Sequence, residues 1–173
     1  MAIQSLNKLA EEAMEKGVSL SSLVAQDEAD ESGIPEAEVR QKMHGMLQAM
    51  GEAVRAGISR ETLSVSGLTG GEAKLYNART QGGESLLGPL AGKAATYALA
   101  SSCVNASMGR IVAAPTAGSC GILPGVLLAM QEGRGYTDDE LVSALLCAAG
   151  VGQVVSARAT LSGAEGGDRK SVV

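Results

Sequence analysis

The feature that most constrains this chain is a run of twenty residues without a charge, Ile111–Met130, with turn-forming residues at its centre. The central segment, APTAGSCGILPG, contains Pro115 and Pro124, which break the continuous helix that a membrane span requires. A second uncharged segment, Leu141–Ala157, has only 17 residues, many of them Ala, Gly and Ser. Both segments are therefore predicted to be buried in a soluble protein, and no membrane partner is expected.

The hydrophobic composition restricts how the core can be built. Hydrophobic residues make up 45% of the chain, yet there is no Phe, no Trp and only three Tyr, while 23 residues are Gly. Such a core consists of Ala, Leu, Val, Ile and Met, and the glycines allow backbones to approach one another closely. Sheets are usually rich in aromatic and β-branched residues. The expected fold is therefore mostly α, with packed Ala/Gly-rich helices joined by glycine-rich polar loops.

Apolar residues recur at helical spacing in several segments, and glycine or proline marks where these segments begin or end. Gly17 follows the first of them, Pro35 and Gly57 mark the two ends of another, and Pro89 precedes a third. A short helix is expected before the acidic patch DEADES, and a capping-box sequence, TDDE, begins at Thr137. The predicted helices cover residues 3–16, 20–24, 35–56, 90–109 and 141–157. In the third, one apolar stripe is expected to be buried: Val39, Met43, Met46, Leu47, Met50 and Val54.

Charge and cysteine content exclude several classes of function. The formal net charge is -5 and no Lys/Arg cluster occurs, so no nucleic acid partner is expected. The N-terminus carries acidic residues early, unlike a secretory signal, which predicts a cytoplasmic location.

Cys103, Cys120 and Cys147 form no C-x-x-C pair, which argues against a disulfide framework and a self-contained zinc site. Cys103 and Cys147 are predicted to be buried free thiols. His44 is predicted to be a partly exposed helical residue rather than a catalytic base.

Three polar, glycine-rich loops are the candidate binding elements: SGLTGG at 66–71, PTAGSCG at 115–121 and SGAEGG at 162–167. The first two precede segments that can start a helix, where unpaired backbone N–H groups and the helix dipole favour a small anion. If all three converge, they would form a pocket for a small carboxylic acid. Each loop alone is also explained as an ordinary turn and cap. The glycine-rich segments 64–74 and 80–93 are expected to be ordered loops and not a flexible linker.

The three loops, in this order and with VNASMGRIVAAPTAGSCGILPGVL between the first and the last, resemble the catalytic domain of the bacterial iron–sulfur-dependent L-serine dehydratases, also called L-serine ammonia-lyases. The alpha chain of the two-subunit form is the most similar. The resemblance runs from Ile3 to Gly167, and its segments are specific jointly rather than singly. It implies a mostly helical catalytic domain that deaminates L-serine to pyruvate and ammonia by β-elimination of water.

The resemblance also implies a [4Fe-4S] cluster held by three cysteines, whose open iron acts as a Lewis acid on the serine hydroxyl while a base removes the α-proton. It implies L-serine as substrate, a homo- or hetero-oligomer, and a beta-chain partner, because no regulatory domain precedes Met1. It assigns no catalytic base. The hydroxyls and N–H groups of the second loop are expected to face the substrate. The substrate-binding positions that match the family's loops are Thr69, Gly70, Gly71, Asn105, Thr116, Ala117, Gly118, Ser119, Ser162, Gly163 and Ala164.

The sequence departs from the family pattern after Gly167. The family places its first cluster cysteine directly after the Gly-Gly pair, where this chain has Asp168, and its other two cysteines come from later segments. No cluster ligand is therefore expected in this chain, which alone is expected to be inactive. The final residues, DRKSVV, match no family segment and can be encoded by one frame of a sequencing-library adapter. Residues 1–167 are expected to be the N-terminal part of the catalytic domain, and 168–173 a non-native tail.

Two other functions remain open at this point. One is a cysteine desulfidase-like lyase with a similar cluster, which the yields of pyruvate from serine and cysteine would distinguish. The other is a non-catalytic helical domain that binds small carboxylates or another chain through the same loops.

Overall fold

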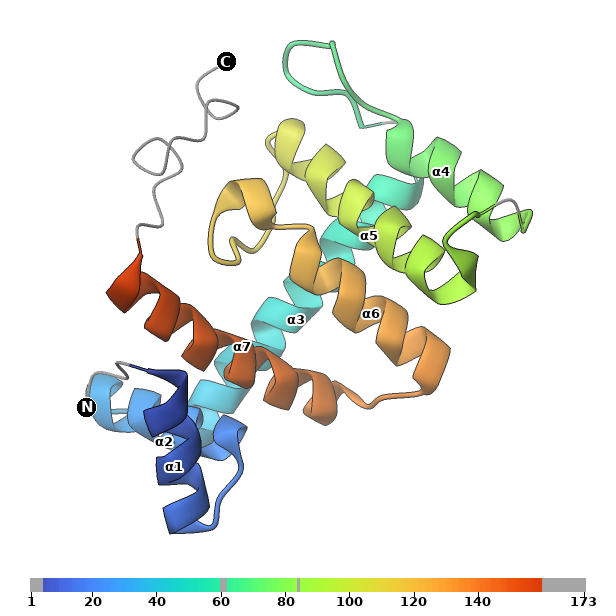
Figure 1. Cartoon of the computed structure of the whole chain (residues 1–173). Coiled ribbons are helices and arrows are strands. Elements are labelled where there is room, and N and C mark those ends of the chain that lie inside the picture. The colour runs from blue at the N-terminus through green and yellow to red at the C-terminus, as the bar shows by residue number, and fades with distance from the viewer. Residues whose placement is uncertain (1–4, 60–61, 84, 160–173) are drawn as a thin grey trace. The chain divides into compact units, whose positions relative to one another are not determined.

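The computed structural model describes residues 5–59, 62–83 and 85–159, and these are mostly helical (Figure 1). Within that part of the chain there are seven α-helices, one 3-10 turn and no strand, with an isolated antiparallel bridge between Leu63 and Gly70. The expectation of a mostly α fold is therefore confirmed. The elements are α1 (Leu6–Lys16), α2 (Leu20–Ser32), α3 (Glu36–Ser59), α4 (Glu72–Gln81), α5 (Gly88–Ala106), the 3-10 turn (Ala117–Ser119), α6 (Ile122–Arg134) and α7 (Asp138–Arg158).

The helices divide into two compact units. The terminal unit contains α1, α2, the start of α3 up to His44, and α7 from Asp139 onward. The central unit runs from Gly45 to Asp138 and contains the rest of α3 together with α4, α5, the 3-10 turn and α6. The first two glycine-rich loops both belong to the central unit.

A small aliphatic core holds the terminal unit together. Leu9 and Ala13 of α1 pack with Leu23 and Val24 of α2, and all four side chains are buried. Gly150 of α7 lies against the same core, where a Cβ atom would come within 2.6 Å of Val24 Cγ2. This cluster is built without an aromatic side chain, as the composition predicts.

Helix ends in the terminal unit follow local signals, with one departure from expectation. α1 begins after the Ser5 cap and ends at Gly17, which has φ 63°. α2, predicted to stop before the acidic patch, continues through it, because Ser19 caps its start and the end signal comes only at Gly33, with φ 68°. Acidic residues are compatible with an exposed helix face, so the patch does not end the helix. Ile3 of the predicted first helix lies outside the described residues.

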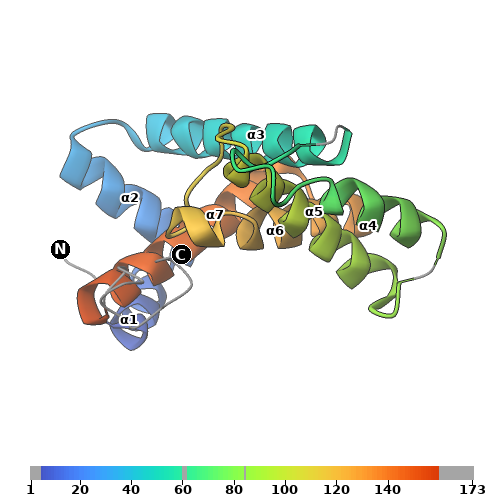
Figure 2. The ribbon, with the colours of Figure 1, turned by 90° about the horizontal axis from the view of Figure 1, so that it is seen from above.

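In the central unit, α5 packs against both α4 and α6, and the three helices lie side by side in Figures 1 and 2. A Cβ at Gly125 of α6 would lie 2.7 Å from the Ala94 carbonyl oxygen, and one at Gly121, just before α6, would meet the backbone of Ala98. The two helices therefore touch backbone to backbone, which the high glycine content predicts. The buried cluster around them comprises Val54, Ala73, Tyr97, Ala100, Cys103 and Ala129.

Gly57, predicted to end its helix, lies instead inside α3, which continues beyond it. The residue is buried, and a Cβ there would lie 2.7 Å from both the Cα and the carbonyl carbon of Ala100 in α5. This glycine therefore permits helix packing and does not terminate a helix.

The predicted stripe on α3 is also partly wrong, since Met46 is 47% exposed whereas Leu47 and Met50 are buried.

A polar cluster joins α5 to α6 at the buried side chain of Tyr97. Its hydroxyl donates to Glu132 Oε2 at 2.7 Å, and Lys93 Nζ donates to the same oxygen at 2.8 Å. Burial and the neighbouring Glu132 carboxylate raise the pKa of Tyr97, so the phenol stays protonated. Burial alone would raise the pKa of Glu132, but the hydrogen bonds from Lys93 and Tyr97 outweigh it and lower that pKa overall. One ionised carboxylate on α6 is therefore bound by two side chains of α5.

α7 begins at Asp138, directly after Thr137, as the sequence predicts. Among the described residues it is the one helix long and apolar enough to cross a membrane. Length and composition alone are weak evidence for a span, because the core helix of a soluble protein meets the same criteria. Leu145 and Leu146 of α7 are buried, but only 33% of its most apolar 18-residue window is buried.

Candidate functional site

The predicted substrate-binding residues that the structure describes lie in three places in the central unit. They are the loop before α4 (residues 62–71, here the first loop), the last turn of α5 at Asn105, and the 3-10 turn before α6 (residues 116–119, here the second loop). Ser162, Gly163 and Ala164 lie outside the described residues, as does Asp168. Convergence with the third glycine-rich loop therefore stays a prediction.

The first loop is an ordered turn that crosses its own backbone at Gly70. Ser64 N–H donates to the Thr69 carbonyl oxygen at 2.7 Å, and Thr69 N–H donates to Ser64 Oγ at 3.2 Å. Gly70 pairs with Leu63, has φ 142°, and would place a Cβ 2.6 Å from Leu63 Cα. Only glycine fits this position without strain, so the glycine there is required by the path of the loop.

Both loops are attached to the last turn of α5. Val65 in the first loop donates its N–H to the Ala106 carbonyl oxygen at 3.2 Å. Asn105 Nδ2 donates to the Ala117 carbonyl oxygen in the second loop at 3.0 Å. The structure therefore brings two of the three glycine-rich loops to one end of one helix, and Asn105 is the side chain that holds the second of them.

The hydroxyl groups of the second loop bond to the loop itself and to the backbone just before it. Ser119 Oγ accepts the Thr116 N–H at 3.2 Å and lies 3.1 Å from Thr116 Oγ1. Ser119 Oγ also donates to the Ala114 carbonyl oxygen at 2.9 Å. These bonds close the turn, and the expectation that the hydroxyls face a substrate stays a prediction. Ala117 and Gly118 are exposed and are the first two residues of the turn. Their backbone N–H groups therefore have no acceptor inside it.

Glu72, which the sequence reasoning missed, connects the first loop to α5. Its Oε1 accepts the Gly70 N–H at 2.9 Å, and its Oε2 accepts the Cys103 S–H at 3.5 Å. The hydrogen bond from Gly70 lowers the pKa of Glu72. The available signal was an acidic residue directly after Gly71 at a helix start, where the dipole favours a carboxylate. Because this carboxylate occupies the start of α4, the first loop is a poor site for a second anion.

Replacing Glu72 with glutamine should lower the melting temperature near about pH 7 and have little effect near about pH 3. The pKa of Glu72 is lowered in the folded chain, so the carboxylate contributes stability above its ordinary pKa of 4.5. That contribution is lost as the pH falls through the lower pKa of the folded state. Thermal unfolding of both proteins across this pH range measures the difference. A difference that stays constant over the whole range would contradict the bond to Gly70.

The three thiols differ in exposure. Cys103 and Cys120 are buried, whereas Cys147 is only half-buried, so the expectation of a buried free thiol is confirmed for Cys103 and wrong for Cys147. Burial is the main reason that the pKa values of the Cys103 and Cys120 thiols are raised. Both of these thiols therefore have a small thiolate fraction at neutral pH.

Iodoacetamide should alkylate Cys147 of the folded chain about tenfold faster than Cys103 or Cys120, because the thiolate is the reacting species and must be accessible. A time course analysed by mass spectrometry of peptides measures the three rates. In denaturant the three rates should become similar, which serves as the control. Faster labelling of Cys103 than of Cys147 in the folded chain would contradict the burial described above.

The described residues do not provide a site for the [4Fe-4S] cluster that the resemblance implies. Among them, no three His, Cys, Asp or Glu side chains gather closely enough to hold a metal ion. The buried Cys103 thiol donates to Glu72, and the buried Cys120 thiol lies 3.9 Å from the Ser101 carbonyl oxygen. Iron–sulfur clusters are normally held by several cysteine thiolates. The cluster therefore does not fit these residues, and no chemical step is assigned to it here.

Comparison with known proteins places these loops in a family context. The chain matches the family model described as serine dehydratase alpha chain over residues 15–172. It is 37% identical over 169 residues to the probable L-serine dehydratase alpha chain of Bacillus subtilis, which covers 98% of this chain and 56% of that protein. It is 35% identical over 153 residues to the L-serine dehydratase alpha chain of Peptoniphilus asaccharolyticus, which covers 88% of this chain and 52% of that protein.

A third relative is the L-serine dehydratase of Streptomyces coelicolor, 34% identical over 157 residues, covering 90% of this chain and 34% of that protein. The chain spans about half the length of the two alpha chains that it matches. No solved structure matches it significantly. The family match and the identity to these relatives show that the chain belongs to the serine dehydratase alpha chain family.

Proposed function

We propose that this chain is part of an L-serine dehydratase, which deaminates L-serine to pyruvate and ammonia, and that its first and second loops hold the substrate. Support comes from the family and from relatives named L-serine dehydratase. The observation that carries the proposal is the attachment of both loops to the last turn of α5, through Val65 to Ala106 and through Asn105 to Ala117. Two polar loops held at one helix end are suited to contact one small molecule.

L-Serine carries a carboxylate and an ammonium group, so its site needs hydrogen-bond donors and an acidic acceptor. In this proposal the backbone N–H groups of Ala117 and Gly118 bind the carboxylate, since successive N–H groups in a turn favour anions. The exposed Glu72 carboxylate, which directly follows Gly71, binds the ammonium. Asn105 is a positioning residue, because its amide holds the second loop through Ala117.

For the whole enzyme we also propose a beta-chain partner, because two of the relatives are named alpha chain. A homo- or hetero-oligomer and a cytoplasmic location are proposed on the same family grounds. A [4Fe-4S] cluster in the whole enzyme rests on the resemblance alone. The roles proposed for the loops, binding and orientation of L-serine, do not depend on it.

The test is a titration of the isotope-labelled chain with L-serine, followed through the backbone amide signals of Gly70 and Gly118. The proposal predicts saturable shifts at both signals with one dissociation constant, because one ligand contacts both loops. Shifts at neither loop, or saturation at one loop while the other is unchanged, would contradict it.

Two matched variants distinguish an effect on binding that acts through the position of the second loop from one that acts through the stability of α5. Asn105→Ala should weaken L-serine binding by about tenfold, equivalent to about 1.4 kcal/mol, because it releases the Ala117 carbonyl. Ser102→Ala is the control, since Ser102 is exposed on the same helix and its Oγ donates to the Ala98 carbonyl oxygen one turn earlier. Equal weakening by both substitutions would mean that Asn105 acts through the helix and not through the loop.

A further inference from the structure

A groove in the terminal unit carries charged side chains that belong to neither loop. It has a volume of about 520 Å³ and is lined by residues near the start of α3 and the start of α7. α3 contributes Arg40, Gln41 and His44, and α7 contributes Asp139 and Ser143. The volume falls within the usual range for small-molecule sites, about 300–1,000 Å³. A guanidinium, a carboxylate, an amide and a hydroxyl therefore line one space, which suits a small polar molecule.

Arg40 is anchored on its own side of the groove. Its Nε donates to Glu36 Oε1 at 2.9 Å, and its Nη2 donates to Ser22 Oγ at 3.3 Å. A guanidinium has five N–H donors, so this anchoring orients the group and leaves donors for a ligand. Within the described residues the ion pair of Arg40 is with Glu36 on the same helix and not with Asp139 on α7. A positive and a negative group therefore line the groove from two different helices.

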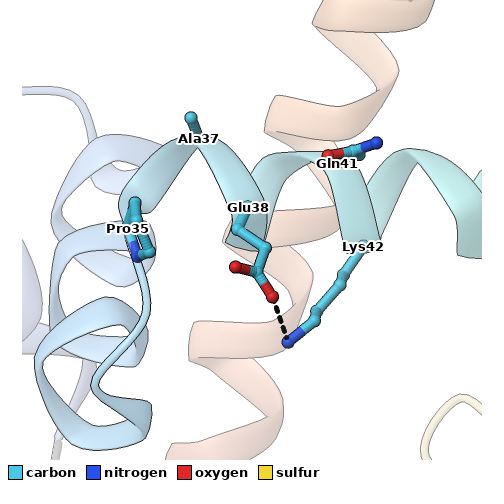
Figure 3. A pocket seen from close by; sticks show the side chains of 5 residues that line it. All are labelled: Pro35, Ala37, Glu38, Gln41 and Lys42. Carbon is cyan, nitrogen blue, oxygen red and sulfur yellow. Dashed lines mark ion pairs between the residues drawn. The ribbon is translucent and has the colours of Figure 1, made fainter.

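In the neighbouring hollow on α3, the two charged side chains are paired with each other. It is larger, about 620 Å³, and is lined by Pro35, Ala37, Glu38, Gln41 and Lys42. Figure 3 shows Glu38 and Lys42 joined to each other, with 3.0 Å between Oε1 and Nζ. These two lining charges are paired with each other, whereas Arg40 in the groove is paired with Glu36, which does not line the groove, and not with Asp139, which does. The separation of charge, and not the volume, distinguishes the groove between α3 and α7.

We propose that the groove between α3 and α7 binds a zwitterionic α-amino acid. The guanidinium of Arg40 binds its carboxylate, and the carboxylate of Asp139 binds its ammonium, both through charge-assisted hydrogen bonds. Ser143 and Gln41 are placed to bond a polar side chain of the ligand. The groove shares no residue with the first and second loops, and the inference does not rest on the function proposed for them.

The test compares amino acids with analogues that each lack one of the two charges. The probes are L-serine and L-glutamine, with N-acetyl-L-serine, which has no ammonium, and L-serinamide, which has no carboxylate. Binding to the chain is followed through the backbone amide signals of His44 and Ser143. We expect L-serine or L-glutamine to shift both signals saturably, and each analogue to bind at least about tenfold more weakly than L-serine. No shift with either amino acid, or equal binding of L-serine and an analogue, would overturn the proposal.

Substitutions in the groove test the same two interactions by removing each charged group of the protein in turn. Asp139→Asn should remove the preference for L-serine over N-acetyl-L-serine, and Arg40→Gln should remove the preference over L-serinamide. Because Arg40 also contacts Glu36 and Ser22, the unfolding midpoint of each variant is measured first. Asp139→Asn carries the test if Arg40→Gln does not fold. Lys42→Gln is the control and should leave binding unchanged; an unaltered preference in Asp139→Asn would overturn the proposal.

The failure of this inference and the failure of the proposed function are distinguishable. Asn105→Ala should diminish the shifts of Gly70 and Gly118 and leave those of His44 and Ser143 unchanged. Asp139→Asn should do the reverse. Loss of both sets of shifts in either variant would show that the groove is not an independent site, and would overturn the inference.

Discussion

Replacing Gly57 with alanine should lower the free energy of unfolding by about 3 kcal/mol, although alanine is the better helix former. The added Cβ would lie 2.7 Å from both the Cα and the carbonyl carbon of Ala100. Backbone atoms cannot rotate aside as a flexible side chain can, so α3 and α5 would have to move apart. The packing of Val54 and Ala100 in the buried cluster would be loosened by that movement. Urea denaturation followed by circular dichroism measures the change.

Gly45→Ala on the same helix is the matched control. Gly45 is exposed, and a Cβ there would have no neighbouring atom within 4 Å. This substitution should raise the free energy of unfolding by about 0.5–1 kcal/mol, because alanine loses less backbone entropy on folding. Because the two substitutions are the same and lie on one helix, opposite changes in the free energy of unfolding would isolate the contribution of packing. A stabilising effect of Gly57→Ala would be incompatible with the close contact between α3 and α5.

Replacing Gly70 with alanine should open the first loop and make amide hydrogen exchange at Val65 and Thr69 at least about tenfold faster. Gly70 has φ 142°, a conformation that alanine rarely adopts, and the added Cβ would lie 2.6 Å from Leu63 Cα. Strain and overlap together are worth about 3 kcal/mol. The loop can escape this cost by giving up its pairing with Leu63, so the effect appears in local exchange rather than in global unfolding.

Gly67→Ala in the same loop provides the comparison. Gly67 also has a positive φ, 70°, but a Cβ there would have no neighbour within 4 Å. The expected cost is therefore the left-handed conformation alone, about 1 kcal/mol, with a correspondingly smaller rise in the exchange rates. If Gly70→Ala raised these rates no more than Gly67→Ala, the close crossing at Leu63 would not be what holds the loop.

Three helix ends were predicted correctly from local signals, whereas α4 and α6 lie outside the predicted helices and α5 ends at Ala106, before the predicted residue 109. α1 ends at Gly17, α3 begins after Pro35, and α7 begins after Thr137. Gly57 was misleading because the same residue type either ends a helix or admits a neighbouring backbone, and only the packing of α5 distinguishes the two. The acidic patch of α2 was misleading because charged residues continue an exposed helix face, so the end is set by Gly33.

The segments of the candidate site were predictable, whereas their hydrogen bonds were not. The motifs place Thr116 and Ser119 in a polar loop, but the bonds between their side chains arise from the geometry of the 3-10 turn. Glu72 and Cys103 are 31 residues apart and meet because α4 packs on α5. Spacing along the chain cannot predict such a pair, since it depends on which helices become neighbours.

The contact of Gly125 with Ala94 limits how the interface between α5 and α6 can be repaired by mutation. In most cores, an enlarged side chain is accommodated by a smaller neighbour. Here the neighbour is a carbonyl oxygen, 2.7 Å from the position of the new Cβ, and every amino acid carries the same carbonyl. No substitution at Ala94 removes that oxygen, so a genetic selection for revertants of Gly125→Ala should recover glycine at position 125 and no suppressor at position 94.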